Sequence, residues 1–386
     1  MEFAQRLEPL QANVFADMDR AKARARAAGH GVVDLSLGSS DLPVAPHVLA
    51  VIAAAIPDPA THGYCLFSGT AAFRLAVAQW YEAKFGLAVD PETEVLLLIG
   101  SQEGTAHLPL AVLNPGDIAL LTDPGYPSHA GGVYLASGEV YTLPLRPERQ
   151  FLPEFGAIPP AVLERSRLLV LSYPHNPTAA TASLEFWQEA VAFCHRHQIL
   201  LAHDFPYADL TFTGQPAPSV FQADRQKSLS VEFFSFSKSY NMGGFRIGYA
   251  IGNREIIRAL RQVKAAVDFN QYAGIQRGAI AALTGPQDSV QHTIHTYRQR
   301  RDAAVAAFQA IGWPVAVPEA TLYLWVKLPE AWEHRSMDFC THLVATTGVA
   351  LAPGIGFGPA GEGYVRLALV HPPEVLATAI AKMKQA

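Results

Sequence analysis

The segment VEFFSFSKSYNMGGFRIGYAIG, residues 231–252, joins two apolar runs through a polar, glycine-rich turn. Continuous apolar runs bounded by such turns are typical of strands that are buried on both faces. Lys238 lies in the turn, where apolar and glycine-rich neighbours make a charged ammonium costly. Burial favours the neutral amine, which is nucleophilic enough to form a Schiff base with an aldehyde. The segment therefore predicts a buried sheet with a reactive lysine at a strand end.

Similar apolar runs precede this segment along the chain. They end in turn residues, and several are followed by helical stretches, which is typical of a parallel sheet covered by helices on both faces. The earlier runs lie at 95–99, 118–121, 168–172 and 199–203, and helices are expected at 102–113, 183–197 and 254–267.

The remainder of the chain predicts a second, smaller unit. Residues 286–310 are expected to form one long helix that leaves the sheet. Strand-like stretches at 322–328 and 364–370 then bracket an expected helix near 336–347. This order of elements indicates a small α+β domain.

The N-terminal residues are expected to join the small domain. Apolar positions at helical spacing predict an amphipathic helix within 11–28, and an extended segment follows. We therefore expect an α/β fold with an N-terminal part of the small domain at 1–45. The large domain would be 46–285, and the rest of the small domain 286–386.

Composition excludes several classes of protein. Half of the 386 residues are hydrophobic and only 16% are charged, which argues against a disordered chain. A net charge of −5 gives no electrostatic reason to expect a nucleic-acid partner, and the basic residues within 20–26 and 298–301 are expected on solvated helix faces. No apolar run has the length of a signal peptide core or a membrane span. Three cysteines without a CxxC pair are typical of buried thiols in a reducing compartment, so we expect a cytoplasmic protein.

Polar residues stand where five of the apolar runs end. Because the carboxyl ends of parallel strands meet at one edge of a sheet, where ligands bind, we expect these side chains to lie together. An anion-binding loop, two tyrosines, an amide, a carboxylate and a lysine at one edge indicate a cofactor pocket. The residues are Ser101, Gln102, Tyr126, Asn176, Asp204, Tyr207, Ser235, Ser237 and Lys238.

Two features of this set indicate the kind of cofactor. Ser101 and Gln102 open a helix, whose N–H groups and dipole attract a phosphate, and Arg246 across the NMGG turn adds a guanidinium. Asp204 either caps a helix or, if it is buried beside a pyridine ring, keeps the ring nitrogen protonated, as an electron-sink cofactor requires.

Two other patterns are set aside. His195, His197 and His203 have no acidic or cysteine partners at metal-ligand spacing, so we expect helix-end and core histidines and no metal site. GIGFG, 354–358, lacks the strand–turn–helix context of a dinucleotide-binding fingerprint and is expected to form a loop near the substrate.

Nearly the whole chain closely resembles the fold-type-I pyridoxal-phosphate aminotransferases of class I/II. The motifs that carry the resemblance are, in chain order, YPHNPT (173–178), HDFPYADL (203–210), SFSKSYNMGGFRIG (235–248) and YVRLAL (364–369). The resemblance implies a mostly parallel seven-stranded sheet between helices, with a smaller α+β domain formed by both chain ends. It also implies that Lys238 binds pyridoxal 5′-phosphate (PLP) as a Schiff base and moves a proton between the substrate α-carbon and cofactor C4′. Asp204 would contact the pyridine nitrogen, and Tyr207 and Asn176 would contact the ring 3-oxygen. Tyr126 would stack on the ring. The phosphate would be bound by Ser101, Gln102, Ser235, Ser237 and Arg246.

The resemblance also implies how substrate and partner are bound. Arg366 would bind the substrate α-carboxylate as a bidentate fork, which a lysine cannot reproduce. Asn176 and the backbone at Gly38 would border the substrate. Tyr64 has the position from which the family reaches the phosphate of the neighbouring subunit, so a homodimer with shared active sites is implied.

Some motifs depart from the family pattern. GSSD replaces the usual GEPD after Leu37, and Phe245 replaces a usual tryptophan. DFNQY, 268–272, has no arginine where aspartate aminotransferases carry a second one, which favours a small, neutral or amide-recognised substrate side chain. Other motifs are most similar to the branch with alanine (glutamate–pyruvate) and LL-diaminopimelate aminotransferases.

The expected activity is therefore ping-pong amino transfer between an L-amino acid and 2-oxoglutarate or pyruvate, a reaction type common in amino-acid biosynthesis. A β-eliminating or C–S lyase with the same cofactor is the alternative, because the same chemistry can expel a leaving group. A PLP-binding sensor without turnover is a remote alternative, because only about 30 residues precede the core and they show no helix-turn-helix pattern.

Overall fold

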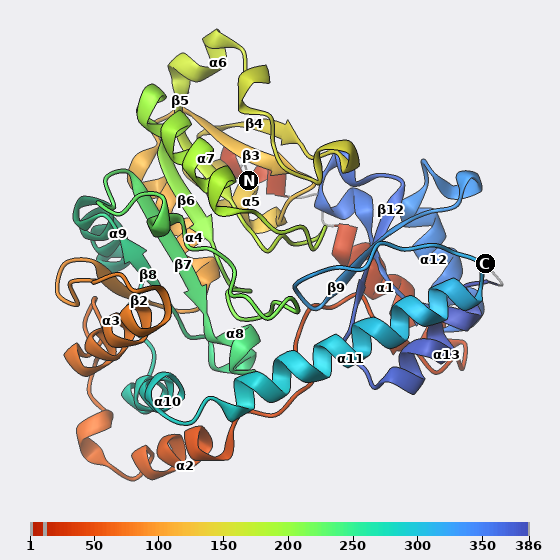
Figure 1. The fold of residues 1–386 in the computed structure, drawn as a ribbon, viewed down its shortest axis with the longest axis horizontal. Helices are drawn as coiled ribbons and strands as arrows, with labels where there is room; N and C mark the ends of the chain where they lie inside the picture. Colours follow the sequence, from red (N-terminus) through yellow and green to blue (C-terminus); the bar gives the residue numbers. More distant parts are fainter. Residues whose placement is uncertain (1–2, 11–13, 385–386) are drawn as a thin grey trace.

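The computed structural model describes residues 3–10 and 14–384, which form a large sheet domain and a smaller α+β domain (Figure 1). The large sheet has seven strands in the order β2-β8-β7-β6-β5-β3-β4. β8 is antiparallel to both neighbours, and the other strands run in a common direction. This arrangement confirms the predicted mostly parallel sheet. The strands are β2 (Val95–Leu98), β3 (Ile118–Asp123), β4 (Glu139–Pro144), β5 (Ser166–Leu171), β6 (Leu200–Asp204), β7 (Ser230–Ser235) and β8 (Gly248–Gly252).

Helices cover both faces of this sheet because its strands bury alternate residues in two separate cores. In β5, Leu168 and Val170 join one core, whereas Leu169 and Leu171 join the other. The first core packs against α4 (Ser101–Val112), α5 (Pro127–Leu135) and α9 (Arg254–Val267). The second packs against α2 (Pro46–Ala55), α3 (Ala71–Phe85), α7 (Leu184–His197) and α10 (Ala273–Thr284). Short α6 (Pro160–Arg165) precedes β5, and α8 (Phe236–Ser239) follows β7.

The small domain contains residues from both ends of the chain. Its three-stranded antiparallel sheet has the order β11-β12-β9, and β1 near the N-terminus pairs in parallel with β10. The long α11 leads from the large domain to this part of the molecule (Figure 1). The elements are α1 (Val14–Ala27), β1 (Val33–Asp34), α11 (Asp288–Ala310), β9 (Tyr323–Lys327), α12 (Ser336–Thr347), β10 (Val349–Ala350), β11 (Ala352–Pro353), β12 (Tyr364–Ala368) and α13 (Pro373–Met383).

One strand of the large sheet was not predicted from the sequence. β4 lies at the sheet edge, where most of its residues are exposed or half-buried, so it lacks a continuous apolar run. The predicted helices at 102–113, 183–197, 254–267, 286–310 and 336–347 are confirmed to within two residues at each end. Of the predicted helix within 11–28, residues 11–13 lie outside the described residues.

The expectation of solvated basic helix faces was wrong for two residues. Lys22 is buried, and its Nζ lies 2.9 Å from Asp34 Oδ2. Arg300 is buried too, and its two Nη atoms donate to the carboxylate of Asp41 at 2.6 and 2.7 Å. Both ion pairs hold the segment between α1 and α2 in place. Lys22 binds this segment to α1, and Arg300 binds it to α11. A charge pattern does not reveal this role, because both partners lie outside the two basic runs.

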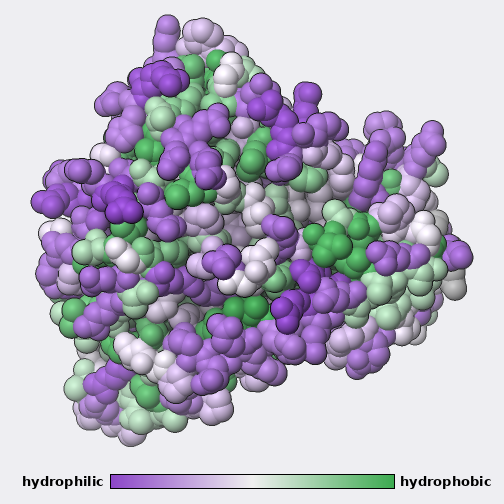
Figure 2. Space-filling model, in the orientation of Figure 1, coloured by the Kyte–Doolittle hydropathy of each residue, from purple (hydrophilic) through white to green (hydrophobic). Residues whose placement is uncertain are grey.

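Polar side chains spread over most of the face shown in Figure 2, with hydrophobic patches between them. Within the described residues, no helix combines the length and the apolar composition that crossing a membrane requires. Cys194 and Cys340 are buried as expected, whereas Cys65 is only half-buried, and all three are free thiols.

Candidate active site

Lys238 lies on the one-turn helix α8, directly after β7. Ser235 caps this helix, because its Oγ accepts the backbone N–H of Ser237 at 3.1 Å. Lys238 Nζ donates to the carbonyl oxygen of Gly38 at 2.5 Å and lies 6.0 Å from the centre of the Tyr207 ring. The structure thus brings Lys238 together with Gly38 and Tyr207, which come from distant parts of the sequence.

Positive charge is concentrated beside α8, where the N-terminus of helix α4 lies against the guanidinium of Arg246. Gly100 has a φ of +74° and stands at the N-cap of α4. A Cβ placed on Gly100 would lie only 2.6 Å from Arg246 Nη2, so the guanidinium lies against the helix start. One placed on Gly248 would lie 2.8 Å from the backbone nitrogen of Ser101. Exposed N–H groups, a helix dipole and a guanidinium in one place suit a phosphate.

Asp204, at the end of β6, has one oxygen engaged and one free. Its Oδ2 lies 3.0 Å from His129 Nε2, while its buried Oδ1 has no hydrogen-bond partner among the described residues. A buried acceptor without a partner is costly, so Oδ1 is suited to a ligand N–H such as that of a pyridinium ring. The residues present therefore fit a pyridine cofactor with a phosphate.

His129 was not found from the sequence. It lies on α5, three residues after Tyr126, and the two rings are 5.6 Å apart. Side chains three residues apart at the start of a helix lie on one face. The spacing between Tyr126 and His129 was therefore the sequence signal that could have revealed His129. Tyr126 OH also donates to Gln102 Oε1 at 3.3 Å, and burial raises the pKa of Tyr126.

Arg366, on strand β12 of the small domain, places a positively charged guanidinium in the candidate site. It is only 6% exposed, and its Nη1 donates to Asn176 Oδ1 at 2.7 Å. Its Nη2 donates to the carbonyl oxygen of Ser36 at 2.8 Å. Its Nε is buried without a partner among the described residues. The guanidinium also lies 4.7 Å from the ring of Phe357. Phe357 belongs to the GIGFG segment, which forms a short 3-10 helix over Gly354–Phe357 where a loop was expected.

Tyr323, on β9, is a second residue that the sequence did not reveal. Its hydroxyl lies 3.0 Å from that of Tyr207, and its ring lies 4.2 Å from the Arg366 guanidinium. Burial raises the pKa of Tyr207 well above its usual value, and the neighbouring Tyr323 adds to that effect. Burial alone would raise the pKa of Tyr323, but the positive charges of Arg366 and Lys238 outweigh it and lower that pKa. Trp325 and Arg366 pair across the strands, so alternation along β9 puts Tyr323 on the same face as Arg366.

Tyr64 lies outside this group. It is 86% exposed, and its ring packs 5.2 Å from that of Phe269. In the same 268–272 segment, Gln271 Nε2 donates to the carbonyl oxygens of Leu98 and Arg246, at 2.9 and 3.0 Å. This segment therefore supports Arg246 and the end of β2 from outside.

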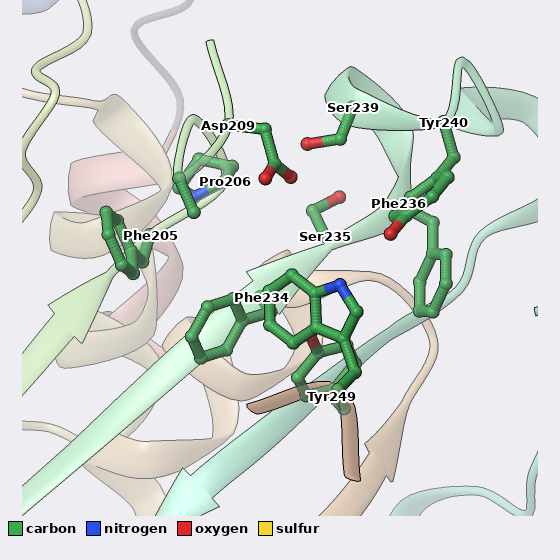
Figure 3. Close-up of a pocket in the computed structure, with 11 residues that line it drawn as sticks. Phe205, Pro206, Asp209, Phe234, Ser235, Phe236, Ser239, Tyr240 and Tyr249 are labelled. Carbon is green, nitrogen blue, oxygen red and sulfur yellow. The ribbon is translucent and has the colours of Figure 1, made fainter. Parts of the chain in front are cut away.

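A second pocket lies against α8 and is largely aromatic. Its lining does not include Lys238. Asp209, Ser235 and Ser239 point toward one another at its polar end, while the rings of Phe234 and Tyr249 lie farther in (Figure 3). Asp209 is paired with Lys84. The aromatic side chains that line this pocket therefore support helix α8.

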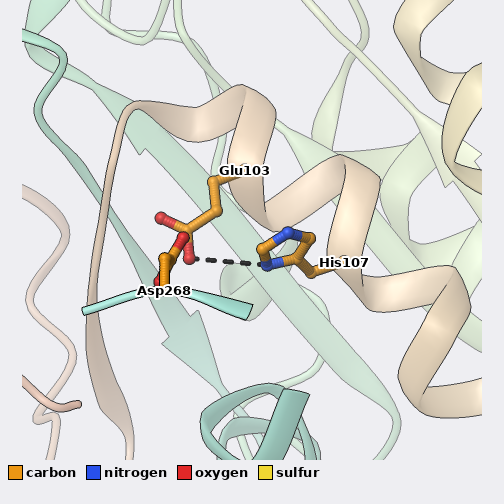
Figure 4. A group of neighbouring side chains, drawn as sticks. All are labelled: Glu103, His107 and Asp268. Atoms are coloured by element: carbon orange, nitrogen blue, oxygen red, sulfur yellow. Dashed lines mark ion pairs between the residues drawn. The ribbon is translucent and has the colours of Figure 1, made fainter. Parts of the chain in front are cut away.

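Glu103, His107 and Asp268 converge at metal-ligand distances (Figure 4). Lys264 Nζ lies 2.8 Å from Glu103 and 2.9 Å from Asp268, so an ammonium already supplies the positive charge. Burial opposes ionisation of Glu103, but the nearby His107 and Lys264 outweigh it and lower the pKa of Glu103.

His195, His197 and His203 lie at a helix end or in the core, as expected from the sequence. His195 and His197 lie in the last turn of α7, and His203 is buried with its Nδ1 2.9 Å from Glu232.

Comparisons with known proteins agree with this geometry. Residues 30–383 match the family model described as aminotransferase class I and II. The chain is 44% identical, over 383 residues, to an LL-diaminopimelate aminotransferase of Dehalococcoides mccartyi, covering 99% of this chain and 98% of that protein. It also resembles the substrate-bound structure of BacF from Bacillus subtilis (TM-score 0.95, 35% identity, 100% and 98% of the two chains). A probable N-succinyldiaminopimelate aminotransferase from Thermus thermophilus gives a TM-score of 0.91 at 42% identity, covering 96% and 99% of the chains. The chain therefore belongs to the class I and II aminotransferases and is a PLP-dependent transaminase.

Proposed function

We propose that the residues gathered around Lys238 hold PLP and the amino-acid substrate in the roles that the family resemblance implies. Ser101, Gln102, Ser235, Ser237 and Arg246 would bind the phosphate, Tyr126 would stack on the ring, and Tyr207 and Asn176 would face its 3-oxygen. The observation that carries this proposal is the free, buried Oδ1 of Asp204, which lacks an N–H donor that a ligand can supply. His129 would hold the Asp204 carboxylate in place through its other oxygen.

When bound, PLP acts as an electron sink for the bond that breaks at the substrate α-carbon. Lys238 Nζ would attach the cofactor and then carry the proton between that carbon and cofactor C4′. Arg366 would bind the substrate carboxylate, for which its unpartnered Nε is available. Gly38 leaves room beside Lys238, and the contacts of Arg366 with Asn176 and Ser36 would help to exclude water.

For the substrate, we propose that LL-diaminopimelate is the amino donor and 2-oxoglutarate the acceptor. Support comes from relatives named LL-diaminopimelate aminotransferase at 40–44% identity over nearly the full chain. The absence of arginine from 268–272 argues against an aspartate-type enzyme.

We further propose a homodimer with shared active sites, in which Tyr64 reaches the phosphate of the partner. An exposed apolar patch formed by Tyr64, Leu66, Val267 and Phe269 supports this, because a patch of this kind usually marks an interface.

The proposed domain bounds are 1–45 with 286–386 for the small domain and 46–285 for the large one. Most hydrophobic residues support this division by falling into two cores, although Tyr207, Leu210 and Phe212 pack with the small-domain core and Val290 with the large-domain core. A cytoplasmic location is supported by the three free cysteines.

The test is the visible absorbance spectrum of the purified holoenzyme before and after each candidate donor. LL-diaminopimelate should convert the bound cofactor to its pyridoxamine form, and 2-oxoglutarate should restore the starting spectrum. L-alanine, L-glutamate, L-aspartate and N-succinyl-LL-diaminopimelate are run separately, and faster conversion by one of them would replace the proposed donor. Release of a keto acid and ammonia without amino transfer would instead indicate the lyase.

A further inference from the structure

We propose that Tyr323 is a positioning residue whose hydroxyl sets the direction of the single proton on Tyr207, and thereby how firmly Tyr207 holds the cofactor 3-oxygen. The two hydroxyl oxygens are 3.0 Å apart. The inference rests on the contact proposed above between Tyr207 and that oxygen.

The Tyr323 hydroxyl is held in place by its surroundings. Both phenols are 2% exposed, and their rings meet edge to face at 5.8 Å and 77°. A Cβ on Gly38 would lie 1.9 Å from the Tyr323 oxygen, so this hydroxyl lies directly against the Gly38 backbone. The Arg366 guanidinium covers the ring from the other side. The hydroxyl cannot move away from Tyr207 without displacing one of these groups.

Counting protons shows what this contact requires. A phenol has one proton to donate and can also accept. If Tyr207 donates to the 3-oxygen of the cofactor, it has no proton left for Tyr323. The contact at 3.0 Å then persists as a hydrogen bond only if Tyr323 donates to Tyr207. A hydroxyl that accepts one hydrogen bond is a stronger donor in the next, because the two bonds polarise each other.

The charged and titratable groups around Tyr323 favour this direction. Arg366 on β12 supplies positive charge that makes the Tyr323 hydroxyl more acidic and so a better donor. Lys238 on α8 adds to this effect only while its nitrogen carries a positive charge. Among the described residues, two further phenols act on the pair, Tyr126 at the start of α5 and Tyr297 on α11.

The measurable consequence is the pH at which the linkage between Lys238 and the cofactor loses its proton. A hydrogen bond to the negatively charged 3-oxygen stabilises the deprotonated linkage and lowers that pH. Tyr207→Phe should therefore raise the midpoint. Tyr323→Phe should raise it in the same direction by about half a unit to one unit, since it weakens the Tyr207 bond without removing it.

The experiment is a double-mutant cycle on the full-length holoenzyme, with the visible absorbance of the bound cofactor followed against pH. The variants are Tyr207→Phe, Tyr323→Phe and the double variant. Tyr297→Phe is the matched control, because it removes an equally buried phenol that donates to Ser40 at 2.8 Å, outside the pair. We expect Tyr323→Phe to shift the midpoint in the wild-type background and to have no effect once Tyr207 is phenylalanine. The control should leave the midpoint unchanged.

Additive shifts, or no shift in Tyr323→Phe, would overturn the inference while leaving the proposed function intact. No shift in Tyr207→Phe would instead refute the proposed contact of Tyr207 with the cofactor. Gly38→Ala provides an independent variant, because its Cβ would push the Tyr323 hydroxyl away without deleting it. It should raise the midpoint as Tyr323→Phe does, and an unchanged midpoint would count against the inference even if Tyr323→Phe does not fold.

Discussion

On the large-domain side of the candidate active site, the polar groups stand at the ends of strands or just beyond them; on the small-domain side, they project from within strands. Asp204 ends β6, Lys238 follows the end of β7 by three residues, and Asp204 keeps an unpartnered oxygen. Arg366 and Tyr323 lie within β12 and β9, among aromatic rings, and already bond to groups of the large domain. We therefore expect the large-domain side to act mainly on the cofactor and the small-domain side to act mainly on the substrate. Changes on the two sides should affect different quantities.

The largest effect is expected on the large-domain side from Lys238→Ala. Amino transfer should fall by at least about 10³-fold, because both the covalent attachment and the proton carrier are lost. Single-turnover absorbance changes with a saturating donor would measure this. Lys227→Ala, which removes a lysine paired with Glu94 at 3.1 Å, is the control. Retention of full activity in Lys238→Ala would contradict the central assignment.

Lys264→Met tests the support beneath the start of α4, where we propose that the phosphate binds. It leaves Glu103 and Asp268 without their buried cation, so the free energy of unfolding should fall by about 3 kcal/mol. Glu103 also accepts the backbone N–H of Ile99 at 2.5 Å, so the dissociation constant for PLP should rise as well. Denaturant unfolding and cofactor titration give the two values. Arg277→Met, which breaks an exposed ion pair with Asp58, should change stability by less than about 1 kcal/mol. Equal effects from both variants would mean that the buried cluster has no special role.

Arg366→Lys should act on the substrate and leave the cofactor alone. A lysine cannot form a two-pronged contact with a carboxylate, so kcat/KM should fall by about 10²-fold, mainly through KM. The dissociation constant for PLP should stay within about twofold of the wild-type value. Steady-state kinetics and cofactor titration check the two parts. A large loss of PLP affinity would remove the distinction between the two sides.

The smallest effect concerns Asp123, where the two domains meet. Its Oδ1 accepts the N–H of Ala360 at 3.0 Å, and burial raises the pKa of Asp123. Because the folded pKa is above the unfolded one, the ionised carboxylate costs stability at neutral pH, and this cost disappears as pH falls through the folded pKa. Asp123→Asn keeps the acceptor and should be stabilised by about 1 kcal/mol or less at pH 7, with a smaller gain near pH 4. Thermal unfolding at both values measures this, and Asp302→Asn on the exposed face of α11 is the control. A gain that grows toward low pH would have the wrong sign.

The same contrast explains what could be predicted from the sequence. Lys238, Asp204 and Asn176 were found because each follows an apolar run, and strand ends in a parallel sheet are known to converge. Tyr323 was missed because it is one of several apolar or aromatic residues in LYLWVKL, and nothing local indicates that its partner Tyr207 is 116 positions away. His129 was missed because it lies within α5, after the Pro127 that begins this helix, and does not directly follow an apolar run.

Charges in helices were the other source of error. Lys22 and Arg300 belong to basic runs that resemble ordinary solvated faces, yet their carboxylate partners Asp34 and Asp41 lie on the segment between α1 and α2. Only the path of the chain brings them together. Continuous apolar runs and helical spacing are local properties, so the strands and helices could be predicted from them, whereas ion pairs between distant segments are not local.

The pairing of β1 with β10 has a consequence for the making of the protein on the ribosome. Val33 pairs with Val349, so the N-terminal strand waits without its partner until nearly the whole polypeptide has been synthesised. Strands β2 to β8 end at Gly252 and can pair earlier. Gly38, which accepts the hydrogen bond from Lys238, lies four residues beyond β1. The candidate active site can therefore be completed only late in translation. A nascent chain that stops before residue 349 contains Lys238 but lacks the β1–β10 pair that precedes Gly38.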